Sequence, residues 1–309
     1  MGSETAQQPR RLTAVRVLNR MVNALKNAVF PNKCLSCGSF FHLEQEQIAY
    51  RTVQVMQPVA GCKGICSTRP DSNPVPSHDF HNFCFELFFA SFLCSDCLKG
   101  FIPVEPPLCL ECGIMFQSRV GDDRVCGECI IHPKEFQMAR APGVYSQNLM
   151  GLIHNFKYNG KIQLAKPLSA FLFVAFIHYW DINSIDLIIP VPLHIKRLRK
   201  RGFNQTFLLI RDWFRLAEDL NIKLSGIQIE KDVLVRNRWT KPQTGLDRKK
   251  RLTNIKNAFR VIDPGKVEKK RILLVDDVYT TGATVNECAK VLLNAAALKV
   301  EVLTLARAV

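Results

Sequence analysis

Hydrophobic residues recur in short, regular blocks along the chain from about residue 140 onwards. Apolar positions three and four residues apart predict helices, and short aliphatic runs predict buried strands. The predicted helices are 149–158, 164–179, 203–220 and 283–297, and the predicted strands are 144–145, 186–191, 271–275 and 299–305. Strands that alternate with helices in this way predict an α/β fold, in which helices cover both faces of a parallel sheet.

The first 33 residues follow a different pattern. Apolar residues between positions 12 and 30 fall at helical spacing, with arginines and lysines mostly at the other positions. This predicts a basic amphipathic helix within residues 1–33. We favour a helix that packs against the protein's own body; a membrane-surface helix and a transit sequence are the alternatives.

Two longer apolar stretches, 83–93 and 168–180, are expected to be buried inside the protein. They are too short or too interrupted to cross a bilayer, which takes about 20 residues. No export signal is apparent at the N-terminus. We therefore expect a cytoplasmic protein without a membrane span.

Composition adds a strong positive charge. The chain of 309 residues contains 42 Lys and Arg against 27 Asp and Glu, a net charge of +15. The excess is concentrated in residues 194–271, which carry 22 basic and 8 acidic side chains. A local excess of this kind indicates an anionic partner, either a polyphosphate ligand or a nucleic acid; a solvated basic surface is the alternative.

Cysteine spacing predicts metal sites near the N-terminus. Eight of the twelve cysteines form four Cys-x-x-Cys pairs, a spacing that lets both thiolates of a tight turn reach one ion. Because a closed shell of four thiolates leaves no open position, we predict two zinc ions with structural roles. We assign Cys34, Cys37, Cys94 and Cys97 to one ion, and Cys109, Cys112, Cys126 and Cys129 to the other.

This cysteine module is predicted to span residues 34–135, with residues 38–93 as an insertion inside the first set. Further candidate ligands in the insertion have irregular spacing, which favours unliganded side chains over a third metal site. They are Cys62, Cys66, Cys84, His78 and His81. Redox-active cysteine pairs and an iron–sulfur cluster are the alternatives to zinc for the regular pairs.

The most informative stretch is 271–284, with the sequence RILLVDDVYTTGAT. A buried strand leads into two adjacent carboxylates, Asp276 and Asp277, and a small loop then opens a helix. Free N–H groups at a helix N-terminus bind phosphate, and glycine permits its close approach. The loop residues are Thr280, Thr281, Gly282, Ala283 and Thr284. The stretch predicts a ribose 5-phosphate site, with the carboxylates placed for the ribose diol or Mg²⁺.

Two basic segments are expected to complete this site. Pro192 and Leu193 follow a predicted strand and lead into a run of cations that ends at Arg201. Residues 236–254, which begin with Arg236, combine positive charge with little apolar periodicity. This predicts a loop that closes over a ligand, or an exposed solvated loop. Within it, Trp239 is the best candidate to stack on a nucleobase.

Together these motifs resemble the ComF family, in which a double zinc ribbon precedes a type I phosphoribosyltransferase domain. The resemblance rests on the four cysteine pairs, on residues 152–161, 190–194, 201–205 and 236–259, and on the 276–284 motif. It covers nearly the whole chain except residues 38–93, where the insertion departs from the family pattern. The resemblance implies a type I phosphoribosyltransferase fold for residues 140–309.

The resemblance also implies a ligand, phosphoribosyl pyrophosphate (PRPP) with Mg²⁺, and roles for the candidate residues. Asp276 and Asp277 would hold the ribose hydroxyls and the metal, and residues 280–284 the 5-phosphate. Pro192 and Leu193 would line the ligand site. Arg201 and Arg236 would stabilise the departing pyrophosphate, since preorganised charge is the main means of catalysing such a transfer.

Two functional hypotheses follow from the resemblance, because the family is associated with competence, the uptake and processing of single-stranded DNA in bacteria. In the first, the chain is a phosphoribosyltransferase whose acceptor the sequence does not identify. In the second, the same scaffold is a non-catalytic adaptor that binds single-stranded DNA or a competence helicase. The intact acidic motif favours ligand binding, since an adaptor has no need of that chemistry.

Overall fold

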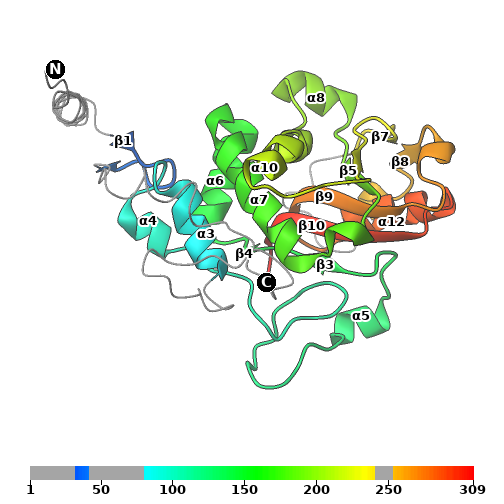
Figure 1. Cartoon of the computed structure of the whole chain (residues 1–309), viewed down its shortest axis with the longest axis horizontal. Coiled ribbons are helices and arrows are strands. Elements are labelled where there is room, and N and C mark those ends of the chain that lie inside the picture. Colours follow the sequence, from blue (N-terminus) through cyan, green and yellow to red (C-terminus); the bar gives the residue numbers. More distant parts are fainter. Residues whose placement is uncertain (1–31, 42–79, 241–252) are drawn as a thin grey trace, which may run out of the picture.

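The computed structural model describes residues 32–41, 80–240 and 253–309 (Figure 1). The predicted N-terminal helix, the candidate ligands Cys62, Cys66 and His78, and residues 241–252 of the basic loop lie outside the described residues.

A parallel sheet forms the centre of the molecule. Its longest strands, β9 (Arg271–Tyr279) and β10 (Lys299–Arg307), pair along nearly their whole length, and β5 (Leu187–Pro190) pairs with the other edge of β9. Short strands complete it: β3 (Ala139–Arg140) and β4 (Gly143–Val144) beside β10, and β6 (Gln228–Ile229) beside β5. The order β3-β10-β9-β5-β6 requires crossover connections, which the helices provide.

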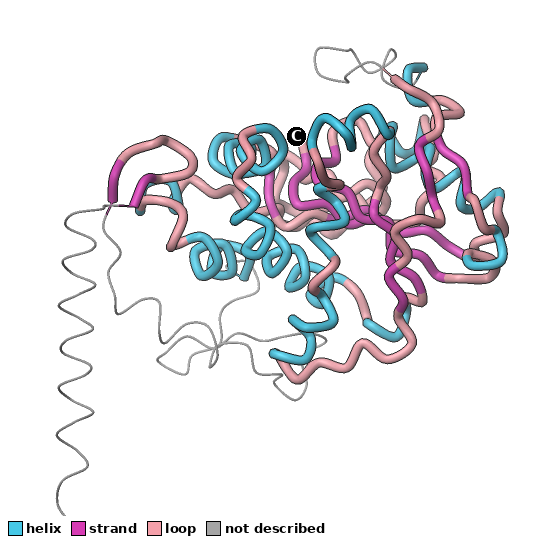
Figure 2. The backbone as a smooth tube through the Cα atoms, turned by 90° about the horizontal axis from the view of Figure 1, so that it is seen from above, coloured by secondary structure: helices cyan, strands magenta, loops and turns pink. Residues whose placement is uncertain are grey.

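Alternate residues of each central strand enter two separate cores. Leu273 and Val275 of β9 belong to one core, and Ile272 and Leu274 belong to the other. The first core is covered by α6 (Gln147–Tyr158), α7 (Ala165–Tyr179), α9 (Gln205–Ile210) and α10 (Trp213–Asp219). The second is covered by α12 (Ala283–Asn294) and the hairpin of β7 (Leu234–Arg236) and β8 (Phe259–Val261). Helices therefore lie on both sides of the strands, as predicted (Figure 2).

Helix α7 is the centre of the first core. Together with the preceding 3-10 turn η1 (Ile162–Leu164), it forms a helical run from Ile162 to Tyr179 that is long and apolar enough to cross a membrane. The apolar stretch 168–180 named in the sequence is the later part of this run, which begins six residues earlier. Two thirds of the run (67%) is buried inside the protein, however, which agrees with the predicted core position.

The N-terminal cysteine region packs directly onto this core. It contains β1 (Asn32–Lys33), β2 (Phe40–Phe41), α3 (Phe80–Phe89), α4 (Ser95–Lys99) and α5 (Gly127–Ile131). Helix α3, from the end of the insertion, lies beside α7 (Figure 1). Phe85 stacks on Phe101 with a centroid separation of 4.1 Å, and both rings meet the edge of Phe171 of α7. Aromatic packing thus joins this region to the α/β body.

Several elements differ from the sequence-based expectation. The predicted helix 203–220 is divided into α9 and α10 around Arg211 and Asp212, and the cationic run forms its own helix, α8 (Ile195–Arg201). Arg236, the first residue of the predicted basic loop, is the last residue of strand β7, which pairs with β8. Strand β9 extends four residues beyond the predicted end, since β10 continues beside it as far as Arg307. Two further 3-10 turns are η2 (Ile182–Ser184) and η3 (Pro264–Lys266).

The Phe85–Phe101–Phe171 contact predicts a large effect of one core substitution. Phe171→Ala should lower the free energy of unfolding by about 3–5 kcal/mol, because it removes a fully buried ring and leaves a cavity. Denaturant unfolding measures this. The control Phe214→Ala, at a residue that is 41% exposed, should change stability by less than about 1 kcal/mol. Equal losses for the two variants would contradict the described packing.

Candidate functional site

The candidate site begins where β9 passes into α12. The 280–284 loop makes this connection, and Gly282 adopts a left-handed conformation (φ +75°) directly before the helix. A side chain at Gly282 would be strained by this φ and would collide with the Tyr279 hydroxyl. The first turn of α12 leaves its N–H groups without intrahelical acceptors, which is the property that binds anions. The predicted strand–loop–helix geometry is therefore present.

Asp277 is nearly buried, and both of its carboxylate oxygens have a partner. Lys157, in the last turn of α6, lies with its Nζ 2.6 Å from Oδ1, and the amide of Gln205 in α9 donates to Oδ2 at 2.9 Å. Gln205 in turn accepts a hydrogen bond from Arg201. Burial opposes the charge of Lys157, but Asp277 outweighs it and raises the pKa of Lys157. Asp277 is thus fixed by α6 and α9.

Asp276 is more exposed than its neighbour and lies in different surroundings. Successive side chains of a strand point to opposite faces, so Asp276 is directed away from Gln205. Its Oδ1 accepts a hydrogen bond from the backbone N–H of Asp277 at 2.8 Å. Burial, reinforced by the charge of Asp277, raises the pKa of Asp276 to about 7, although Lys157 and Arg236 act in the opposite direction. As a whole residue, Asp276 is nevertheless the less buried of the two acids.

Arg236 approaches from the β7–β8 hairpin and is 8% exposed. Its guanidinium donates to the Thr240 hydroxyl and lies over the Phe259 ring, 5.4 Å from the ring centroid. Burial and the nearby Arg197 lower the pKa of Arg236 to about 10, while Asp276 opposes this shift. A buried cation therefore lies near the less buried of the two acids.

Pro192 and Leu193 lie at the exit of β5, next to β9, where the N–H of Val191 donates to the carbonyl of Val275 at 2.8 Å. Helix α8 follows, and His194 caps it by accepting a hydrogen bond from Lys196 N. The pKa of His194 is lowered by burial and by the surrounding cations. The carboxyl ends of β5 and β9 therefore bring these segments to one edge of the sheet.

Trp239 is surrounded by basic residues of this edge. It is 43% exposed, and Lys196 Nζ and the Arg197 guanidinium lie 5.7 and 5.4 Å from the ring centroid. The edge of His194 contacts the same ring at a centroid separation of 5.1 Å. By contrast, Trp213 is fully buried between Phe173 and Phe176.

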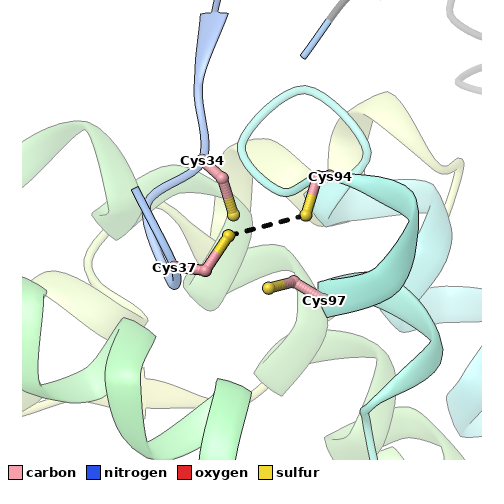
Figure 3. A group of neighbouring side chains, drawn as sticks. All are labelled: Cys34, Cys37, Cys94 and Cys97. Atoms are coloured by element: carbon pink, nitrogen blue, oxygen red, sulfur yellow. Dashed lines mark hydrogen bonds between the residues drawn. The ribbon is translucent and has the colours of Figure 1, made fainter. Parts of the chain in front are cut away.

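The eight paired cysteines form two groups, divided as the sequence predicted. In each group the four Sγ atoms lie within 4.8 Å of one another. Tetrahedral Zn–S bonds of about 2.3 Å require sulfur atoms about 3.8 Å apart. The Sγ atoms of Cys37 and Cys94 (Figure 3), and those of Cys112 and Cys126, are 3.7 Å apart. Each group could therefore hold a zinc ion. We name them the first cluster (Cys34, Cys37, Cys94, Cys97) and the second cluster (Cys109, Cys112, Cys126, Cys129).

The first cluster is attached to α6, the helix that carries Lys157. Asn148 of α6 accepts a hydrogen bond from the Ser36 hydroxyl at 2.9 Å and donates to the Cys97 carbonyl at 2.7 Å. Two residues before Lys157, Asn155 donates to the carbonyl of Leu35. Both turns of the first cluster are therefore hydrogen-bonded to α6.

The remaining candidate ligands that the structure describes take no part in either cluster. His81 of α3 shares a hydrogen bond with the Tyr179 hydroxyl at 2.9 Å, and Cys84 is buried in the aromatic core. Cys288 is also buried, in α12.

Sequence reasoning did not assign Lys157 and Gln205 to the site. Both lie in motifs on which the family resemblance rests, but their contact with Asp277 joins residues 120 and 72 positions apart. The one sequence signal that could have indicated Lys157 is its position near the end of the predicted helix 149–158. A helical glutamine has no comparable signal.

Comparison with known proteins gives a consistent set of relatives. The chain is 33% identical to "DNA utilization protein YhgH" of Shigella flexneri over 218 residues, which are 70% of this chain and 90% of that protein. It is 32% identical to "Competence protein F" of Haemophilus influenzae over 220 residues, which are again 70% of this chain and 90% of that protein. "Competence protein ComFC" of Streptococcus pneumoniae is 29% identical over 219 residues, 70% of this chain and 88% of that protein.

The sequence model of the family described as "Phosphoribosyl transferase domain" matches residues 214–308. Among solved structures, glutamine PRPP amidotransferase from B. subtilis aligns with a TM-score of 0.28 and 20% identity over 45% of this chain. PRPP synthetase from Mycobacterium smegmatis aligns with a TM-score of 0.23 and 16% identity over 46%. This chain spans 25% and 33% of the length of those two proteins.

The buried ion pair predicts a pH-dependent effect of Lys157→Met. At pH 8 the variant should lose about 3–5 kcal/mol of unfolding free energy, because Asp277 keeps a buried charge without its cation. Protonation at lower pH neutralises a buried carboxylate that has lost its cation, so the penalty should shrink as pH falls. Denaturant unfolding at pH 8 and pH 5 measures the difference.

Lys161→Met, at an exposed lysine after α6, is the matched control and should be neutral at both pH values. Lys157→Met/Asp277→Asn should recover most of the loss, because the two side chains form one interacting pair. A Lys157→Met penalty that is small, or that is the same at pH 5 and pH 8, would contradict the ion pair.

Proposed function

The chain belongs to the ComF family, with a cysteine-rich N-terminal region ahead of a phosphoribosyltransferase-type domain, and on that premise we propose that it binds PRPP with Mg²⁺ at the carboxyl end of β9. The domain boundaries that we propose are those expected from the sequence: a cysteine module at 34–135 and a phosphoribosyltransferase domain at 140–309. The ligand is a doubly phosphorylated ribose, and pentosyl transfer from it is the reaction that the site suits.

One observation carries this proposal: two carboxylates lie near the carboxyl end of a central strand, and a left-handed glycine then opens the N-terminus of a 12-residue helix. The helix N-terminus and the hydroxyls of the 280–284 loop would hold the 5-phosphate. Asp276, which is the less buried of the two acids, would accept hydrogen bonds from the ribose diol. Mg²⁺, when bound with PRPP, would neutralise pyrophosphate charge and is a cation that carboxylate oxygens suit.

The partners of Asp277 support a role in preorganisation. Because Lys157 and Gln205 already occupy both oxygens, Asp277 would keep the end of β9 fixed while Asp276 meets the ribose. Such rigidity lowers the cost of ordering the site when a ligand binds.

Charge for the leaving pyrophosphate would come from the arginines around the site. Arg236 lies buried near Asp276, and Arg197 donates to the carbonyl of Thr240 at 3.2 Å beside it. Arg201, the last residue of α8, donates a hydrogen bond to Gln205 of α9 and would add positive charge from that position. Cations held in place before the reaction stabilise negative charge as it develops.

A second function, binding of single-stranded DNA, is favoured by the surroundings of Trp239. A half-exposed indole beside two cations offers a base a stacking surface and its phosphates a counter-charge. The names of the relatives, "Competence protein F" and "DNA utilization protein YhgH", agree with a role in handling DNA. We propose DNA uptake as the process that this chain serves, and a competence helicase as a partner.

The two cysteine clusters are proposed to hold structural zinc. The thiol-only donor set and the 3.7 Å sulfur separations suit this ion, and all ligand positions are taken by the protein. Unoxidised thiols of this kind persist in a reducing compartment, which supports a cytoplasmic location.

Ligand binding is tested by calorimetric titration of the full chain with PRPP and Mg²⁺. We expect saturable heat, and an affinity about 10- to 100-fold lower for Asp276→Asn, because a charge-assisted hydrogen bond to the ribose is lost. The control Asp219→Asn, at an exposed carboxylate of α10, should bind like the wild type. Absence of heat in the wild type, or equal affinity of Asp276→Asn, would refute the proposed site.

A labelled single-stranded oligonucleotide that binds wild type and Trp239→Ala equally would refute the DNA surface.

Metal content is expected to be about two zinc ions per chain, and about one after Cys112→Ser/Cys126→Ser, because two thiolates cannot complete a tetrahedral shell. Elemental analysis of the purified chain measures this. Cys288→Ala, at a cysteine outside both clusters, should retain the full zinc content. Iron in place of zinc, or one equivalent in the wild type, would contradict the proposed pair of zinc sites.

A further inference from the structure

Arg307, at the end of β10, lies between the second cluster and the candidate site. It is 5% exposed, and its Nη2 donates to the Cys112 sulfur at 3.3 Å. Its guanidinium carbon lies 4.3 Å from the centroid of the Tyr279 ring. The Nε and Nη1 atoms are buried and have no hydrogen-bond partner among the described residues. A nearly buried cation therefore faces the cluster on one side and an aromatic ring on the other.

A buried guanidinium is unfavourable unless an anion compensates its charge. Among the described residues, no carboxylate forms an ion pair with Arg307, and its Nη2 donates to the sulfur of Cys112. Four thiolates around one divalent cation carry a net charge of about −2, which meets this need at short range. The orientation of Arg307 should therefore depend on the ionised, metal-bound state of the second cluster.

Tyr279 lies between Arg307 and the 280–284 loop, close to both. The ring is 4% exposed, and Phe136 meets it edge-on at a centroid separation of 6.1 Å. Phe136 belongs to the same core as the four cysteines of the second cluster. On its other side, the Tyr279 hydroxyl occupies the space over Gly282 that a side chain would fill. Since Gly282 fixes the turn into α12, a shift of the Tyr279 ring would displace the loop.

We propose that Arg307 is a positioning residue that couples the metal-bound second cluster to the 280–284 loop, through Tyr279. Loss of the metal would remove the counter-charge of Arg307, release the Tyr279 ring and loosen the loop. The inference rests on the proposed metal at the second cluster and is independent of which ligand the loop binds. Through this coupling, the cysteine module would help to set the conformation of the 280–284 loop.

The chain offers a matched control for this role. Arg124 belongs to the same cysteine region and also lies over an aromatic ring, with its guanidinium 3.9 Å from the centroid of Phe116. It is exposed, however, and it contacts neither Tyr279 nor the loop. Arg124→Met therefore removes a comparable cation–ring contact without interrupting the proposed link.

Amide hydrogen exchange of the metal-loaded full chain, read by mass spectrometry in peptides that cover residues 279–286, tests the coupling. Relative to wild type, Arg307→Met should exchange about tenfold faster in these peptides while keeping its zinc, and Arg307→Lys should recover part of the protection, because a cation is restored. The exchange rate of peptides that cover β5 should be unchanged, which distinguishes a local effect from a general loss of stability. Arg124→Met should match the wild type.

A second arm uses the wild type alone, so that the test does not depend on how well Arg307→Met folds. A chelator is added, and alkylation mapped to each cysteine identifies when the second cluster has lost its metal. Faster exchange at 279–286 in step with that loss supports the coupling. Unchanged exchange at 279–286, either after metal loss or in zinc-loaded Arg307→Met, overturns it. Because PRPP is absent from both arms, failure here is separate from failure of the proposed ligand.

Discussion

The site depends on the contacts that compensate the negative charge of the Asp277 carboxylate. This side chain is 5% exposed at the end of the central sheet, where an uncompensated charge would cost several kcal/mol. Lys157 from α6 and Gln205 from α9 meet it from two different crossover connections. The end of β9, the last turn of α6 and the first turn of α9 are consequently held together. Asp276 is left as the less buried of the two acids.

The two cysteine clusters support the same edge of the sheet from different directions. The first cluster is hydrogen-bonded to α6 through Asn148 and Asn155, so it supports the helix that carries Lys157. The second cluster contacts the ends of β9 and β10 through Tyr279 and Arg307. The helix α3 adds an aromatic contact to α7. The cysteine region and the α/β body therefore share packing and electrostatic contacts.

Local sequence patterns predicted the α/β fold, the position of the acidic motif and the grouping of the eight cysteines, because each depends on spacing along the chain. The length of β9 was not predicted, since adjacent aspartates disfavour a strand and only the ladder with β10 sustains it. The β7–β8 hairpin was missed because its strands have three residues each, too few for a clear alternation. The partners of Asp277 come from distant segments, and their positions depend on tertiary packing.

We propose that a phosphorylated ribose binds between Asp276 and the N-terminus of α12. A crystal structure of the chain with PRPP and Mg²⁺ tests this claim most directly. We expect the 5-phosphate within hydrogen-bond distance of backbone N–H groups of the 280–284 loop, and ribose hydroxyls against Asp276. Ligand density elsewhere on the protein, or a loop closed by its own side chains at saturating ligand, would contradict the claim.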